Sequence, residues 1–98
     1  MALNGKQKRQ LRALGHHLGV VVQVGAEGVT EGVIGAVNQA LKDHELIKVK
    51  LADEDRDSRK DAVEKLANES ASEVAQTLGR TVLLFKQRKK NPKITLVK

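Results

Sequence analysis

The chain of 98 residues contains no cysteine, tryptophan or tyrosine, and Phe85 is its one aromatic residue. Without cysteine, disulfides and thiolate metal sites are excluded, so the fold must depend on a packed core. No apolar run approaches the roughly 20 residues that cross a bilayer. The basic residues of segment 1–12 have no apolar stretch behind them, which disfavours a secretory signal. We therefore expect a cytoplasmic protein that does not bind membranes.

The shortage of aromatic residues also limits how the chain could bind a nucleic acid. RNA-recognition motifs and OB folds stack unpaired bases on aromatic rings, and one ring is too few for such a platform. The remaining contacts are those from Lys, Arg and backbone N–H groups to phosphate and ribose, which favour shape and charge over sequence. Folded RNA, with its exposed sugar-phosphate ridges, suits these contacts better than a DNA major groove.

The net charge of +6 is distributed unevenly along the chain. Residues 1–18 carry +4 and residues 86–98 carry +6, both without an acidic residue, whereas the segment between them carries −4. Basic segments attract polyanions over about a Debye length, ~8 Å at physiological salt. Two basic ends on a mildly acidic body favour a nucleic-acid partner. The alternative is a pair of solubilising tails.

The most informative segment connects a strand to a helix through two glycines. Residues 20–24 are rich in valine and predict a strand, and Thr30 is a suitable N-cap for a helix at residues 31–44. The loop between them contains Gly25, Ala26, Glu27 and Gly28. Two glycines allow a foreign backbone to come close, and free N–H groups at a helix start favour an anion. We predict a phosphate contact at this loop, the alternative being a tight connection without a ligand.

Hydrophobic periodicity predicts seven regular elements. The predicted elements are helices at residues 6–17 and 31–44, a helix opening at Ser58, and strands at residues 20–24, 45–51, 74–78 and 81–86. Ser58 is the expected N-cap because Ser-Arg-Lys-Asp resembles a capping box, and a charged loop at residues 53–57 precedes it. Residues 87–92 are expected to be basic and mobile, and residues 94–97 to add a short strand.

The order α-β-α-β-α-β-β predicts an α/β fold, a two-layer domain with a four-stranded mixed sheet. Strands separated by helices are parallel neighbours, and the last two strands form a hairpin through Gly79-Arg80, which suits a type II′ turn. Residues 45–51 alternate between apolar and basic, so we expect all helices on one face and a solvated second face. The chain is expected to be one domain over residues 1–98, with a core at about 4–86 and a basic tail at 87–98.

Eleven basic residues are candidates for RNA contact because they lie in the basic ends, on the solvated sheet face or in the hairpin turn. They are Lys6, Lys8, Arg9, Arg12, Lys48, Lys50, Arg80, Arg88, Lys89, Lys90 and Lys93. For the two lysines of the sheet, an equally good explanation is a strand kept soluble by charge.

Little in the chain supports catalysis. The glycine loop lacks Gly-Lys-Ser/Thr and the third glycine of a dinucleotide fingerprint. His16 and His17 are adjacent rather than one helical turn apart, and His44 has no evident partner, so no metal site is predicted. The serines fit ordinary helix or loop positions. We expect no enzyme, no cofactor and no small-molecule substrate.

Taken together, several segments resemble the CRM domain (chloroplast RNA splicing and ribosome maturation) in its bacterial stand-alone YhbY-type form. The resemblance covers about residues 4–88. The segments are Gly5-Lys6-Gln7-Lys8-Arg9, Leu11-Arg12-Ala13-Leu14, the glycine loop, Thr30-Glu31-Gly32-Val33, His44-Glu45-Leu46-Ile47-Lys48-Val49-Lys50 and Leu78-Gly79-Arg80-Thr81-Val82-Leu83-Leu84-Phe85-Lys86. The resemblance implies a fold similar to the C-terminal domain of a bacterial translation initiation factor. It also implies RNA binding without catalysis, association with precursors of the large ribosomal subunit, and a KH-like contact of the loop with an RNA backbone.

Glu27 departs from the family pattern, since many relatives place Lys or a neutral polar residue inside the loop. A carboxylate 4 Å from a phosphate costs about 1 kcal/mol even in bulk water. Glu27 therefore either turns away and caps N–H groups near the helix start, or lowers the contribution of the loop. Our hypothesis is a monomeric RNA-binding assembly factor that docks on large-subunit ribosomal RNA or its precursor particle. The alternative is an adaptor whose basic ends bind acidic partners or ribosomal proteins.

Overall fold

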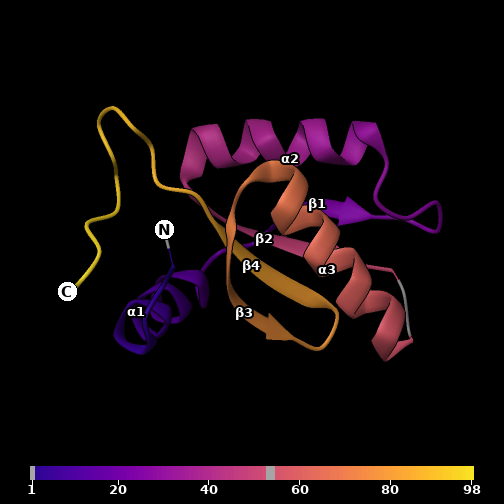
Figure 1. Cartoon of the computed structure of the whole chain (residues 1–98), viewed down its shortest axis with the longest axis horizontal. Coiled ribbons are helices and arrows are strands. Elements are labelled where there is room, and N and C mark those ends of the chain that lie inside the picture. Colours follow the sequence, from indigo (N-terminus) through magenta and orange to yellow (C-terminus); the bar gives the residue numbers. More distant parts are fainter. Residues whose placement is uncertain (1, 53–54) are drawn as a thin grey trace.

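The computed structural model describes residues 2–52 and 55–98 (Figure 1). Its elements are α1 (Gly5–Gly15), β1 (Val20–Val24), α2 (Glu31–His44), β2 (Leu46–Leu51), α3 (Arg56–Ser70), β3 (Glu73–Leu78) and β4 (Thr81–Phe85). The strands form one mixed sheet in the order β1-β2-β4-β3, in which β1 and β2 are parallel and the other neighbours antiparallel. The predicted α/β class, element order and four-stranded mixed sheet are confirmed. The prediction that strands separated by a helix are parallel neighbours holds for β1 and β2 but is wrong for β2 and β3, because β4 lies between them.

The helices begin where a side chain accepts a hydrogen bond from the first turn. Asn4 and Gln7 form a capping box at α1, and Thr30 Oγ1 accepts from the Val33 N–H at 3.2 Å at α2. For α3 the predicted N-cap is wrong. Asp55 is the N-cap and accepts from the Ser58 N–H at 3.1 Å, so Ser58 lies within the first turn. An aspartate one turn earlier supplies the same acceptor and also a favourable charge at the helix start.

Other predicted bounds also differ from the structure. Helix α1 ends at Gly15, two residues before the predicted end, because residues 16 and 17 form a turn. Of the predicted charged loop at residues 53–57, residues 53 and 54 lie outside the described residues. The prediction is wrong for residues 56 and 57, which belong to the first turn of α3.

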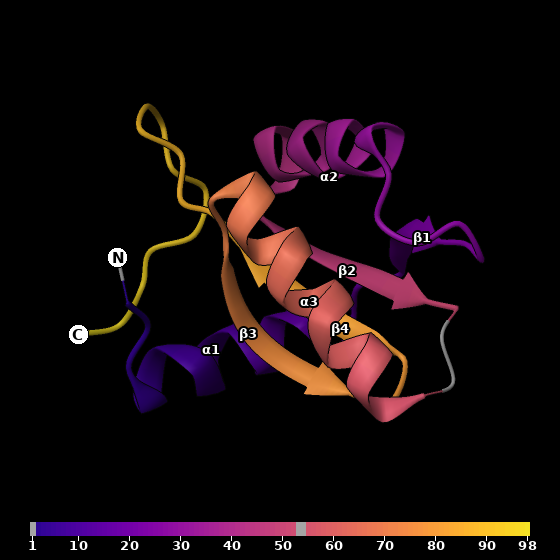
Figure 2. The ribbon, with the colours of Figure 1, turned by 45° about the vertical axis from the view of Figure 1, so that its right-hand side comes forward.

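Helices cover both faces of the sheet, so the prediction of all helices on one face is wrong. Helices α2 and α3 pack on one face, where Val37 and Leu66 are buried against the strands. Helix α1 packs on the other face, where Leu11 is buried in a second cluster with Leu83 and Phe85. Figure 2 shows the sheet between α3 and α1. The reason is that β4 is apolar on both sides and therefore needs cover on both.

A bulge in β3 changes which side chains reach the α1 face. Val74 pairs with Leu84 and Gln76 pairs with Leu83, so Ala75 is an extra residue in the ladder. Regular alternation would place Gln76 on the same face as Val74. The extra residue instead puts Gln76 opposite Leu83, on the face that α1 covers.

The segment after β4 is bound to the domain by a buried carboxylate, and the predicted strand at residues 94–97 does not form. Glu45, fully buried between α2 and β2, accepts hydrogen bonds from the backbone N–H groups of Arg88, Lys93 and Ile94 at 2.8, 2.6 and 2.8 Å. Gln7 and Gln10 of α1 bind the backbone further along the segment. The expected mobile tail is therefore attached at both α1 and the end of α2, and its last residues lie beside α1 (Figure 1).

Candidate functional site

The loop between β1 and α2 is an exposed turn with open space beside its glycines. The Gly28 N–H donates to the Gly25 carbonyl at 3.0 Å, which places Ala26 and Glu27 at the centre of the turn. Gly28 has a φ of +80°, a conformation that other residues rarely adopt. A Cβ on either glycine would meet nothing within 4 Å. An external backbone could therefore come close to this turn.

Glu27 does not cap α2. Its side chain is exposed, and no hydrogen bond joins it to another residue that the structure describes. Thr30 supplies the cap instead. Of the two roles considered for Glu27, capping is therefore wrong, and a lower contribution of the loop to phosphate binding stays a prediction.

The loop lies at the same end of the sheet as two of the predicted basic residues. The Ala52 N–H donates to the Val24 carbonyl at 3.0 Å, and the Leu51 N–H donates to the Arg80 carbonyl at 2.6 Å. Lys50, which pairs with Thr81, is one residue from this junction. Gly79 has a φ of +58°, as the first central position of the predicted hairpin turn requires. The glycine loop, the end of β2 and the β3–β4 turn thus share one end of the molecule (Figures 1 and 2).

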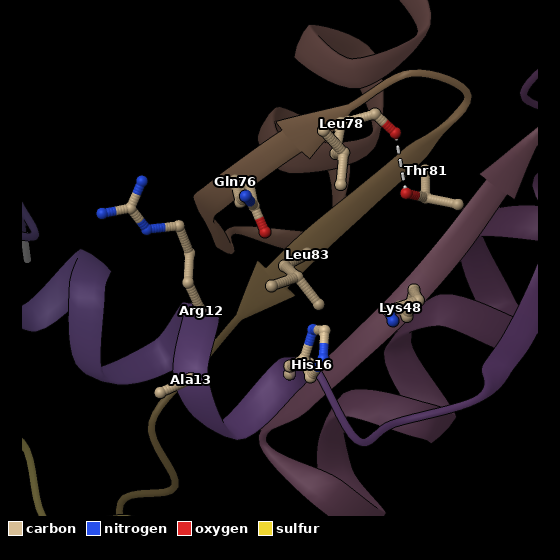
Figure 3. Close-up of a pocket in the computed structure, with 9 residues that line it drawn as sticks. Arg12, Ala13, His16, Lys48, Gln76, Leu78, Thr81 and Leu83 are labelled. Atoms are coloured by element: carbon tan, nitrogen blue, oxygen red, sulfur yellow. Dashed lines mark hydrogen bonds between the residues drawn. The ribbon is translucent and has the colours of Figure 1, made fainter.

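A groove of about 320 Å³ lies between the end of α1 and the sheet. It is lined by Arg12, Ala13, Gly15, His16, Lys48, Gln76, Leu78, Thr81 and Leu83 (Figure 3). Gly15 lets α1 approach β4, because a Cβ there would lie 2.6 Å from Leu83 Cδ1. Arg12 and His16 are one helical turn apart, and Lys48 reaches the groove from β2. The groove thus combines an apolar floor with basic side chains from two elements.

The predicted basic residues do not form one patch. Arg12 and Lys48 line the groove, and Lys50 and Arg80 lie near the glycine loop. Lys6, Lys8 and Arg9 are exposed on α1, where Lys8 is one turn before Arg12 and extends the basic rim of the groove. Arg88, Lys89 and Lys90 belong to the segment after β4, at the end of the molecule opposite the glycine loop (Figure 1).

Arg88 and Lys93 have a structural role that the sequence did not reveal. The Arg88 guanidinium donates to the carbonyls of Lys42 and Asp43 at 2.7 and 2.8 Å, and Lys93 Nζ donates to the Asp43 carbonyl at 3.1 Å. The last carbonyls of a helix lack partners within it and carry partial negative charge. These two side chains therefore stabilise the end of α2. Their contact with RNA stays a prediction.

His16, Gln76 and Thr81 line the groove but were not predicted as site residues. His16 could have been found, because it follows Arg12 by one helical turn. Gln76 could not, because its position depends on the bulge in β3. Within residues 2–52 and 55–98, no three His, Asp or Glu side chains are arranged to hold a metal ion. None of the described helices combines the length and apolarity needed to span a bilayer.

The fold and site define a small α/β domain with an exposed glycine turn and a basic groove under its first helix. The model of the CRS1 / YhbY (CRM) domain matches residues 3–86. The chain belongs to this family, which confirms the resemblance noted in its sequence.

Relatives cover nearly the whole chain. The Pseudomonas aeruginosa protein named "Probable RNA-binding protein PA4753" is 45% identical over 93 residues, which are 95% of this chain and 86% of that protein. The Bacillus subtilis protein named "Probable RNA-binding protein YqeI" is 42% identical over 94 residues, 96% of this chain and 98% of that protein. The solution structure of the hypothetical protein SAV1595 from Staphylococcus aureus matches with a TM-score of 0.85 and 35% identity, covering 97% of this chain and 99% of that one.

Proposed function

We propose that this protein binds structured RNA through one continuous surface. The surface begins at the groove beside α1, crosses β2 at Lys48 and Lys50, and ends at the glycine loop of residues 25–28. The two lysines are two residues apart in one strand, so they project from the same face. This face is the one that α1 covers in part, and it connects the groove with the loop.

The observation that carries the proposal is the open space at the loop. A Cβ added to Gly25 or Gly28 would have no protein atom within 4 Å, and the loop lies beside the basic end of β2. Phosphate approach needs both features, room for a backbone and nearby positive charge. The Pseudomonas and Bacillus relatives are both named "Probable RNA-binding protein", and these names support the same function.

Within this function we propose a role in ribosome assembly. The family resemblance suggests precursors of the large ribosomal subunit as the partner, and RNA binding without catalysis. We further propose that the protein acts as a cytoplasmic monomer. Contacts by charge and by backbone N–H groups suit folded ribosomal RNA, because its sugar-phosphate ridges present shape rather than an accessible base sequence.

A salt series tests the proposal. Binding to a large-subunit RNA fragment is measured by fluorescence anisotropy between about 50 and 300 mM KCl. Affinity that depends on phosphate contacts falls strongly over such a range of salt. We expect the logarithm of the binding constant to fall with the logarithm of salt with a slope of several units. A slope near zero would contradict a surface of phosphate contacts.

The alternative function, an adaptor for acidic proteins, gives a different result in a co-purification experiment. Ribosomal particles that hold the protein through RNA should release it after RNase treatment. An adaptor bound to ribosomal proteins should stay attached, and that result would favour the alternative.

A further inference from the structure

The groove beside α1 has features that phosphate binding alone does not need. Its floor is apolar, made by Leu83 with Leu78 and Ala13 at the sides, and a side-chain amide and a hydroxyl border this floor. Phosphate contacts are made by charged side chains, polar side chains and backbone N–H groups, so an apolar floor contributes nothing to them. An apolar floor with a few polar groups is typical of a site that accepts a defined small group.

Gln76 is directed into the groove by the bulge in β3. Because Ala75 is the extra residue, Gln76 lies opposite Leu83 on the α1 face (Figure 3). No hydrogen bond joins its amide to another side chain or backbone group in the described part of the chain. The amide thus offers two donors and an acceptor to a ligand. Bulges commonly re-aim one side chain in this way at functional sites.

The other polar groups are spaced around the same floor. Arg12 and Gln76 lie on one side of Leu83, and Lys48 and Thr81 lie on the other (Figure 3). The Thr81 hydroxyl donates to the Leu78 carbonyl at 2.8 Å, which leaves its oxygen free to accept a hydrogen bond. The site therefore combines a flat apolar contact, an amide, an acceptor and two cations.

From these contacts we infer that the groove holds one unstacked nucleotide of the bound RNA. The base would lie on Leu83, with its edge at the Gln76 amide. The ribose 2′-hydroxyl would donate to Thr81, and the two flanking phosphates would lie one at Arg12 and the other at Lys48, on opposite sides of the base. The volume of about 320 Å³ lies at the lower end of the range for small-ligand pockets, on the order of 300–1,000 Å³, as a single nucleotide requires. This inference rests on the proposed RNA-binding function.

This site would add sequence preference to a surface that otherwise reads charge and shape. Unpaired bases of loops and bulges can be recognised by stacking and by hydrogen bonds to their edges, and an arginine plane can replace an aromatic ring. The chain has one aromatic residue, Phe85, and that residue is fully buried. In place of an exposed aromatic ring, the groove offers the Arg12 guanidinium and an aliphatic floor.

The inference is tested with five RNA hairpins that have identical stems. One is fully paired, and each of the others carries one bulged nucleotide, A, G, C or U. Wild-type protein should bind at least one bulged hairpin about tenfold more tightly than the paired hairpin, the scale of one base contact. Equal affinity for all five hairpins would overturn the inference.

Gln76→Ala is the matching variant, and Gln39→Ala is its control. Gln39 is exposed on α2, across the sheet from the groove, where its amide donates to Asp43 at 3.1 Å. Gln76→Ala should lose most of the preference among the four bulged bases, whereas Gln39→Ala should keep it. Retention of the full preference by Gln76→Ala would overturn the inference. Thermal denaturation establishes that both variants are folded.

A second measurement uses the unmodified protein, so its result does not depend on whether a variant folds. In heteronuclear NMR spectra, the Gln76 side-chain amide should shift on addition of the preferred bulged hairpin and stay in place with the paired one. Free nucleoside monophosphates carry the same groups, so they are titrated separately. Saturation by a monophosphate at a lower concentration than by the hairpin would identify a free nucleotide as the ligand and overturn the RNA assignment.

These outcomes are distinguishable from failure of the proposed function. If all five hairpins bind equally and with salt dependence, only the inferred nucleotide site is refuted. If neither the hairpins nor a ribosomal RNA fragment bind, both the nucleotide site and the proposed RNA-binding function are refuted.

Discussion

The carboxylate of Glu45 accepts a hydrogen bond of 2.8 Å from the backbone N–H of Ile94, 49 residues further along the chain. The same oxygen binds the Lys93 N–H, and the other oxygen binds the Arg88 N–H. Glu45 has a φ of +63°, an uncommon conformation for a residue other than glycine. One buried side chain thus joins the end of α2 to the C-terminal segment, and Ile94 packs against the second apolar cluster.

Glu45→Gln should weaken this connection. A glutamine can keep the acceptor for Lys93 and Ile94, but its amide nitrogen cannot accept from the Arg88 N–H. An N–H left without a partner costs about 1–3 kcal/mol, so we expect the free energy of unfolding to fall by about that amount. Urea denaturation measures it, and hydrogen exchange should show faster exchange in residues 88–97. Glu64→Gln, on the exposed side of α3, is the control and should leave both unchanged.

Gly25→Asp should reduce RNA affinity without changing stability. Gly25 does not have a positive φ, and its Cβ would meet nothing within 4 Å, so the expected stability change is within about 0.5 kcal/mol. A carboxylate at the loop would repel a phosphate, and we expect at least a fivefold loss of affinity, on the order of 1 kcal/mol. Gly35→Asp in α2 introduces the same charge in open space on the other side of the sheet.

The comparison of Gly25→Asp with Gly35→Asp separates a binding role from a general charge effect. Equal losses of affinity in the two variants would show that the loop is only a connection. Gly28→Asp is less informative, because its φ of +80° makes any side chain strained whether or not RNA binds.

Lys48→Gln should lower the salt dependence of RNA binding. If Lys48 contacts a phosphate, its removal reduces the magnitude of the log–log salt slope by about one unit. Arg12→Gln should act similarly from the other side of the groove. The matched control is Lys65→Gln, since Lys65 is exposed on α3, on the opposite face of the sheet. A slope that changes equally in all three variants would argue against a localised surface.

Arg88→Gln should affect stability more than RNA binding. The variant removes the guanidinium that donates to the carbonyls of Lys42 and Asp43 at the end of α2. The loss of these charge-assisted bonds should lower the free energy of unfolding by about 1–2 kcal/mol. Lys89→Gln removes the neighbouring exposed charge and should leave stability unchanged. Thermal or urea denaturation of the pair checks this, and equal stabilities would refute the capping role.

Much of the fold follows from local patterns in the sequence. The valine run at residues 20–24 and the alternation after Glu45 predict strands, because side-chain periodicity depends on neighbouring residues only. Thr30 identifies the start of α2 because a cap contact is also local and spans only three residues. The exposed glycine loop follows once a strand and a helix are known on either side of it.

Contacts between distant segments determined the rest. The second apolar cluster around Leu11 put α1 on the far face of the sheet, and the sequence had left that face open. Asp55 and Ser58 are both residue types that cap helices, so the residue type alone does not decide between them. The path of the chain into α3 makes Asp55 the N-cap.

The element order, the α/β class, the glycine loop and the basic surface of β2 were determined by the sequence alone, through spacings of two to four residues. The groove and the attachment of the C-terminal segment were decided only by tertiary structure. The groove requires a bulge at Ala75 and the close approach of Gly15 to Leu83, and the attachment requires Glu45 to meet Arg88, 43 positions further along the chain. Neither leaves a periodic signal, because strand register and long-range hydrogen bonds depend on how the whole core packs.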